Sequence, residues 1–128
     1  MALVCALANN PEVQQKAQGE LDTVIGSDRL PRVEHRPTLP YLNALMKELM
    51  YWYNPAPLAV PHYTKEDDEY DGYFIPEGTI IFPNIWSIMH DHSVFDRPLD
   101  FVPQRYLDAD PTTMAMDPER IIFGFGRR

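Results

Sequence analysis

The sequence predicts a mainly α-helical domain with a small β region, in the α+β class. Two stretches carry apolar residues at helical spacing, and between residues 58 and 82 short apolar or β-branched runs alternate with turn residues. Thirteen prolines in 128 residues, about twice the usual frequency, exclude a long helical bundle and predict short elements joined by irregular chain. No linker divides the sequence, so we expect residues 1–128 to belong to a single domain.

The first well-marked helix is predicted over residues 11–25. Asn10 is a typical N-cap residue, and Pro11 suits the first position of a helix. Gly26 favours the left-handed conformation that ends many helices. Residues 1–9 have the composition of the end of another helix, whose beginning we expect upstream of this chain.

A second helix is predicted over residues 41–52. One apolar stripe runs along it, formed by Leu42, Leu45, Leu49 and Trp52. Asn54, Pro55 and Pro57 then end the helical pattern.

The middle of the chain is predicted to form short strands. Residues 58–60 and 73–75 are apolar runs, and residues 79–82 are rich in β-branched side chains. The dipeptide Asp71-Gly72 favours a tight hairpin turn. Beyond these strands we expect a short helix over residues 85–90 and mostly proline-punctuated loop from His92 onward.

Charge and cysteine content exclude several classes of function. The net charge is −8, from 11 basic and 19 acidic residues, which argues against binding to a nucleic-acid backbone. The single cysteine, Cys5, excludes an internal disulfide and any multi-cysteine metal site. No apolar run reaches the roughly 18 residues that a membrane-spanning helix needs.

Four short patterns could be sites, and each has a simpler interpretation. His90-Asp91-His92 could bind a metal, but Val94 occupies the place of the further acid that the hydrolase pattern requires. The acidic residues 67–71 resemble a calcium loop, but Gly78 stands where the bidentate acid is needed. The G-x-G at residues 124–126 has no helix after it. For Cys5, a buried and inert thiol is the simpler interpretation.

Two charged residues lie in apolar surroundings. Glu48 is on the helix predicted at 41–52, with Tyr51 one turn further on the same face. A carboxylate near a buried stripe needs a partner, although spacing alone equally allows an exposed face. Arg105 lies in the apolar and aromatic stretch that begins at Phe101.

Taken in order, these segments resemble the cytochrome P-450 family of haem-thiolate monooxygenases, and in particular its fungal members. PEVQQKAQGELDTVIG resembles the helix before the family's K helix, and LPYLNALMKELMYW resembles the K helix with its E-x-x-R motif. DEYDGYFIPEGTIIFPNIW and HDHSVFDRPLDFVPQRYL resemble the β region and the aromatic-Pro-x-Arg segment that follows. FGFGRR resembles the start of the haem-binding loop F-x-x-G-x-R-x-C. The resemblance covers essentially the whole chain and implies a partial P-450 domain that begins just before the J helix.

The resemblance implies a role for each matching residue. Glu48 and Arg105 would form the buried charge network, as a bidentate pair. The cofactor would be haem, with iron held by a cysteine thiolate. Four residues would contact it: His62 and Arg128 through the propionates, Phe123 beside the axial ligand, and Gly126 where the backbone approaches the porphyrin.

The sequence departs from the family pattern in three respects. The axial cysteine would fall at position 130, and Cys5 matches a helix far from that loop. The oxygen-activating helix would lie upstream of the chain. Position 51 should be arginine and is Tyr51, which leaves Glu48 with Arg105 and a hydroxyl that we expect to donate to Glu48. In two further, milder departures, Asn54 and Tyr63 replace residues that are usually proline and arginine.

We therefore expect a piece of a haem-dependent monooxygenase that is inactive by itself. An intact relative would use an NADPH-dependent reductase and a small organic substrate, at the cytoplasmic face of the endoplasmic reticulum membrane. Two alternatives stay open. One is a non-catalytic, acidic interaction module or pseudogene product, and the other is a His/Asp metal hydrolase.

Overall fold

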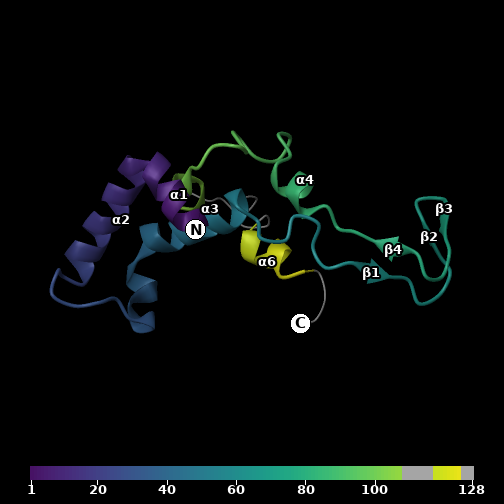
Figure 1. The fold of residues 1–128 in the computed structure, drawn as a ribbon, viewed down its shortest axis with the longest axis horizontal. Helices are drawn as coiled ribbons and strands as arrows, with labels where there is room; N and C mark the ends of the chain where they lie inside the picture. The colour runs from purple at the N-terminus through teal and green to yellow at the C-terminus, as the bar shows by residue number, and fades with distance from the viewer. Residues whose placement is uncertain (108–116, 125–128) are drawn as a thin grey trace.

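Helices and strands occupy opposite ends of the molecule (Figure 1). The structure is a computed structural model, and it describes residues 1–107 and 117–124. The α-helices are α1 (Ala2–Asn9), α2 (Pro11–Val24), α3 (Pro40–Trp52), α4 (Ile85–Met89) and α6 (Pro118–Ile122). Two 3₁₀ helices, η1 (Val33–Thr38) and η2 (Pro103–Tyr106), lie in the connections. The strands are β1 (His62–Tyr63), β2 (Asp68–Tyr70), β3 (Tyr73–Ile75) and β4 (Ile80–Ile81).

The N-terminal helices follow the sequence pattern, except at the cap between them. The helix predicted at residues 11–25 is α2, and Gly26 after it has a φ of +89°. Asn10 occupies the N-cap position of α2, as predicted, but its side chain does not cap that helix. Its side-chain amide donates to the carbonyl of Ala6 at 2.8 Å, so it closes the end of α1 and makes no cap bond to α2.

Helix α3 is the element against which the others pack. Its N-terminal amides have no cap within their own segment, and Glu20 of α2 supplies one from outside. Its two carboxylate oxygens accept from the amides of Tyr41 at 2.8 Å and Leu42 at 2.9 Å. An acid at a helix N-terminus satisfies free amides and complements the helix dipole. This contact fixes α2 against the start of α3.

Two hydrophobic clusters meet on α3. The first joins α1, α2 and α3 to Phe101 through the buried residues Ala6, Val13, Ala17 and Leu45. The predicted stripe on α3 contributes here, because Leu42, Leu49 and Trp52 pack against this cluster. The second joins the end of α3 to α4 and α6, through Tyr51, Ile85, Met89, Phe95 and Ile121.

The strands form two short antiparallel pairs that extend away from the helices (Figure 1). In the first pair β1 lies against β4, with His62 opposite Ile81. In the second, β2 and β3 are joined by the predicted turn at Asp71 and Gly72, whose φ angles are +50° and +78°. Positive φ at both residues is what a two-residue hairpin turn requires.

The prediction of a strand at residues 58–60 is wrong. This segment is a turn in which Ala59 has a φ of +52°, and the Ala59 amide donates to the Ala56 carbonyl at 2.9 Å. Pro57 and Pro61 flank the turn and have no amide hydrogen to give to a ladder. Pairing therefore begins only at His62.

The C-terminal part contains more helix than we predicted from its prolines. Both η2 and α6 lie where loop was expected. Helix α6 begins with a cap in which a side-chain oxygen of Asp117 accepts from the amide of Glu119 at 3.0 Å. Pro118 occupies the first turn of this helix. Asp-Pro-Glu is the same kind of start signal as the one before α2, so the sequence did carry this information.

Within the part of the chain that the structure describes, none of the helices has the length and apolar character needed to cross a bilayer.

Candidate functional site

A buried ion pair joins α3 to the segment formed by residues 96–105. Glu48 is fully buried on α3, and Arg105 lies on η2 with a side chain that is 12% exposed. Arg105 Nε donates to Glu48 Oε2 at 2.9 Å, and the Val102 amide donates to Glu48 Oε1 at 2.7 Å. Both carboxylate oxygens therefore have a donor, so this charge can be buried without an unsatisfied acceptor.

The remaining nitrogens of Arg105 bind backbone carbonyls rather than the carboxylate. Nη1 donates to the Asp96 carbonyl at 2.7 Å, and Nη2 donates to the carbonyls of Arg97 and Asp100 at 3.1 Å and 3.2 Å. The expected bidentate pairing with Glu48 is wrong, because a single guanidinium nitrogen reaches that side chain. Arg105 thus shapes the 96–105 segment and also ties it to α3.

Tyr51 lies against Arg105 and not against Glu48. Its hydroxyl donates to the carbonyl of Pro98 at 3.1 Å, so the expected bond to Glu48 is wrong. The guanidinium carbon of Arg105 lies 5.0 Å from the centre of the Tyr51 ring, within the range of a cation–π contact.

Burial dominates the electrostatics of this site. Desolvation raises the pKa of Glu48 to about 7, although the Val102 amide and the Arg105 guanidinium both act to lower it. Burial also raises the pKa of Tyr51 to about 12, so this phenol stays protonated near neutral pH.

A second ion pair, which we did not predict, holds α6 to α3. Lys47 of α3 binds Asp117, the residue that caps α6. The two lie 70 positions apart in the chain. The sequence marks Asp117 only as a helix cap, so it gave no indication of this partner. The ion pair and the cap bond together fix the start of α6 beside α3.

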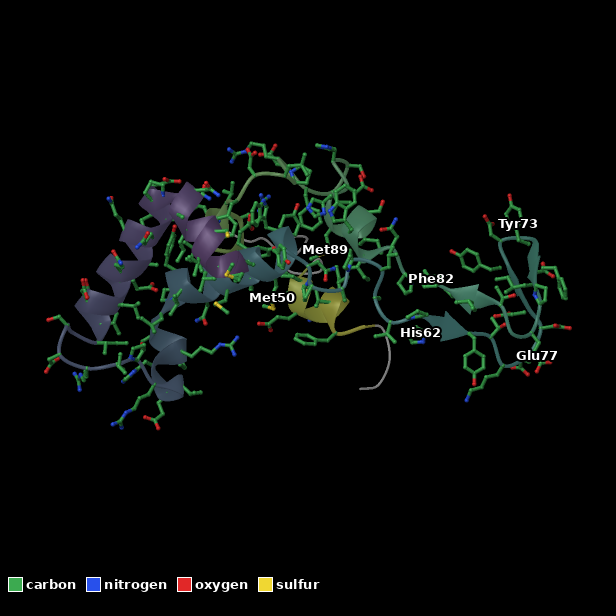
Figure 2. The ribbon with its side chains drawn as sticks, in the orientation of Figure 1. Met50, His62, Tyr73, Glu77, Phe82 and Met89 are labelled. Atoms are coloured by element: carbon green, nitrogen blue, oxygen red, sulfur yellow. The ribbon has the colours of Figure 1, made fainter. Side chains whose placement is uncertain are left out.

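His62 lies at the start of the β1–β4 ribbon and is exposed. Figure 2 shows it where the ribbon leaves the helical part, well away from Tyr73 and Glu77 at the hairpin end. Apolar side chains surround this position in the sequence and across the ribbon: Val60, Ile80, Ile81 and Phe82 are all exposed. The imidazole is therefore a polar group within an apolar surface.

Phe123 follows α6 and is 71% exposed. It borders an open groove together with η1 and α3, which contribute Val33, Leu42, Met46 and Met50. Gly126 and Arg128 lie outside the described residues, so two of the four residues expected to contact haem have no structural description.

The alternative sites have structural explanations. His90 is buried and stacked between Trp86 and Tyr51, with ring centres 4.6 Å and 5.6 Å away, and its Nδ1 lies 2.8 Å from the Trp86 carbonyl. In the acidic hairpin, Asp67 accepts from the Glu77 amide at 2.8 Å. Across residues 1–107 and 117–124, no group of three or more His, Cys, Asp or Glu side chains is placed to hold a metal ion. Cys5 is exposed on α1, not buried as we expected.

Comparison with known proteins identifies the family. A family model described as cytochrome P450 matches residues 1–128. The chain belongs to this family. It is 52% identical over 128 residues to the cytochrome P450 monooxygenase COX1 of Coprinopsis cinerea, covering 99% of this chain and 25% of that protein. It is 46% identical over 123 residues to the O-methylsterigmatocystin oxidoreductase of Aspergillus flavus, covering 96% of this chain and 23% of that protein.

A solved structure agrees in fold as well as in sequence. A structure of a zebrafish cytochrome P450 with abiraterone matches with a TM-score of 0.85 and 33% identity, covering 99% of this chain and 28% of that one. The predicted fold class, a mainly helical piece of the cytochrome P450 fold with small sheets, is confirmed. The chain spans about a quarter of the length of these relatives.

The described residues fit part of the surroundings of haem, the cofactor of this family. A porphyrin has broad apolar faces and two carboxylates, so it needs apolar contact and hydrogen-bond donors. The exposed His62 with its apolar neighbours, and the exposed Phe123, offer both kinds of contact. An axial thiolate is not among the contacts that these residues offer, because the single cysteine of the 128 residues, Cys5, lies on α1.

Proposed function

We propose that this chain forms the α3 scaffold and part of the haem surroundings of a haem-thiolate monooxygenase. The observation that carries the proposal is the fully hydrogen-bonded, buried Glu48–Arg105 pair, in a chain that the family model matches over its whole length. The pair holds residues 96–105 against α3, so that the segments on either side keep a fixed position.

The other site residues then have separate tasks. His62 donates a hydrogen bond to one haem carboxylate, and Phe123 packs beside the axial ligand. Gly126 allows close approach of the backbone, and Arg128 binds the second carboxylate. What supports these four roles is the match of the residues to the family motif, together with the exposure of His62 and Phe123.

For the whole protein we propose monooxygenation of a small organic substrate. One oxygen atom of dioxygen enters the substrate and the other leaves as water, with electrons from an NADPH-dependent reductase. Haem, when bound, supplies the activation of dioxygen. We propose the endoplasmic reticulum membrane, at its cytoplasmic face, as the location. The 128 residues alone are proposed to be inactive, because a thiolate ligand has to come from outside them.

A chimaera tests this proposal directly. Residues 1–128 would replace the matching quarter of the Coprinopsis cinerea relative. We expect the chimaera to bind haem and to give the absorption spectrum of a thiolate-ligated, carbon monoxide-bound haem. A folded chimaera without that spectrum would show that this chain cannot form part of a haem-binding site. That result would favour the alternative function, a non-catalytic, acidic interaction module.

Two variants of the chimaera test the role of His62. His62→Leu removes the donor while keeping an apolar side chain, and we expect faster loss of haem to an apo-globin acceptor. His92→Leu is the matched control, since His92 is also exposed but lies outside the proposed haem surroundings. Equal rates of haem loss in the two variants would contradict the role of His62.

A further inference from the structure

The N–H groups of Arg105 are engaged in hydrogen bonds, and its guanidinium carbon lies over an aromatic ring. Nε, Nη1 and Nη2 together donate to Glu48 and to three backbone carbonyls. These bonds lie in the plane of the guanidinium, because its N–H groups form a planar fork. The Tyr51 ring is a further restraint, because Cζ of Arg105 lies over the face of this ring, 5.0 Å from its centre.

Tyr51 is itself held from several directions. It is fully buried, and its hydroxyl donates to the Pro98 carbonyl. The Phe95 ring lies 4.8 Å away at 50°, and the His90 ring lies 5.6 Å away at 20°. The ring of Tyr51 therefore has little freedom to move away from Arg105.

The charges in this site balance without a second cation. When Glu48 is ionised, it carries one negative charge and Arg105 carries one positive charge. Lys47 is paired with Asp117, and Tyr106 packs edge-on to Tyr51 at 6.4 Å as a neutral phenol. An arginine at position 51, which the family pattern leads one to expect, would place two cations beside one buried carboxylate. Tyr51 instead offers the negative face of an aromatic ring to the cation already present.

We propose that Tyr51 is a positioning residue for Arg105: its ring face takes the place of the second cation and keeps the guanidinium in register with Glu48 and the 96–105 segment. Tyr51 is thus a functional replacement for the family arginine, and the network of Glu48 and Arg105 stays intact. Tyr51 acts through Arg105 and needs no contact with haem for this role.

Fluorinated phenylalanines at position 51 test the proposal without changing the shape of the ring. Tyr51→Phe comes first, because it removes the hydroxyl and keeps the ring. Incorporation of mono-, di- and trifluorophenylalanine then weakens the negative face of the ring stepwise. We expect the equilibrium ratio of folded to unfolded 128-residue chain, from denaturant unfolding at protein concentrations where the chain sediments as a monomer, to fall with each fluorine, by roughly fivefold over the series. A merely space-filling ring would give no such trend.

Two controls make the result specific. The same series at Phe101, a buried ring that packs edge-on to Trp52, should give a smaller slope, because that ring meets another ring and not a full positive charge. In an Arg105→Gln background the trend at position 51 should disappear. If Arg105→Gln does not fold, the comparison of positions 51 and 101 decides alone. A flat series at position 51, or equal slopes at both positions, would overturn the proposal.

Discussion

Glu48 is the residue with the most unusual environment. Its side chain is fully buried, and it has one charged partner and one amide donor. Removing one partner of such a pair costs roughly 3–5 kcal/mol, because the other charge stays buried. The sequence placed Glu48 beside an apolar stripe but left its exposure open, since helical spacing gives a face and not the neighbours of that face. The partner, 57 positions away, came only from the resemblance.

The raised pKa of Glu48 predicts how stability depends on pH. The folded-state pKa of about 7 lies above the usual 4.5, so the folded chain binds the proton more tightly than the unfolded chain. The free energy of unfolding should therefore fall as pH rises from about 4.5 to 7, and level off above that. The total change is on the order of 3 kcal/mol. Denaturant unfolding at a series of pH values measures it.

Glu48→Gln should flatten this pH profile, because the titrating group is gone. Glu66→Gln is the matched control, since Glu66 is exposed on the way to the acidic hairpin, and it should leave the slope unchanged. A Glu48→Gln profile with the slope of the parent chain would show that another group is responsible.

Among the elements, glycine has opposite effects in the hairpin and in a helix. Gly72 has a φ of +78°, and Gly19 is in the middle of α2; at both positions an added Cβ meets nothing within 4 Å. The effect of alanine at these two positions therefore differs only through the backbone conformation, which is left-handed at Gly72 and helical at Gly19. Gly72→Ala should lower the free energy of unfolding by about 1–2 kcal/mol, and Gly19→Ala should raise it by about 0.5–1 kcal/mol.

Thermal unfolding of the two variants against the parent chain measures both effects. The hairpin could unfold before the helices, so the Gly72→Ala measurement needs a local probe, such as hydrogen exchange of the hairpin amides. A destabilising Gly19→Ala would contradict the assignment of that residue to a regular helix.

The elements show which sequence patterns carry structural information. Helices α2 and α3 and the turn at Asp71-Gly72 were predictable, because local residue preferences decide them. Residues 58–60 were not, because their apolar composition suits a strand while the flanking prolines prevent pairing. Asn10 has the predicted N-cap position, but its side chain binds α1, because a side-chain amide can donate to the last carbonyls of one helix as well as accept from the first amides of the next. Local sequence did not distinguish these two uses.

For the whole molecule, the exposed apolar surface of the strand ribbon predicts self-association. Val60, Tyr63, Ile80 and Phe82 are each more than half exposed on or beside the β1–β4 pair. Exposed apolar surface of this kind, next to open strand edges, favours contact with other chains. We expect the isolated 128-residue chain to show a sedimentation coefficient that rises with protein concentration.

A lysine at the centre of that surface should reduce the association. Ile80→Lys places a charge on β4, whereas Leu30→Lys changes an even more exposed apolar residue, in the connection after α2. Only the first is expected to lower the apparent mass. If the chain stays monomeric at all concentrations, or if both variants have the same effect, the β1–β4 surface does not mediate self-association.

The central position of α3 also restricts how this segment can change over evolutionary time. Helix α2 buries Val13 and Ala17 on one side and can vary on the other. Helix α3 touches two hydrophobic clusters, the carboxylate of Glu20 and the start of α6, so within it only Pro40 and Met46 are exposed. A replacement in α3 therefore has to fit several neighbours at once, as the ring of Tyr51 does beside an Arg105 that keeps the family residue.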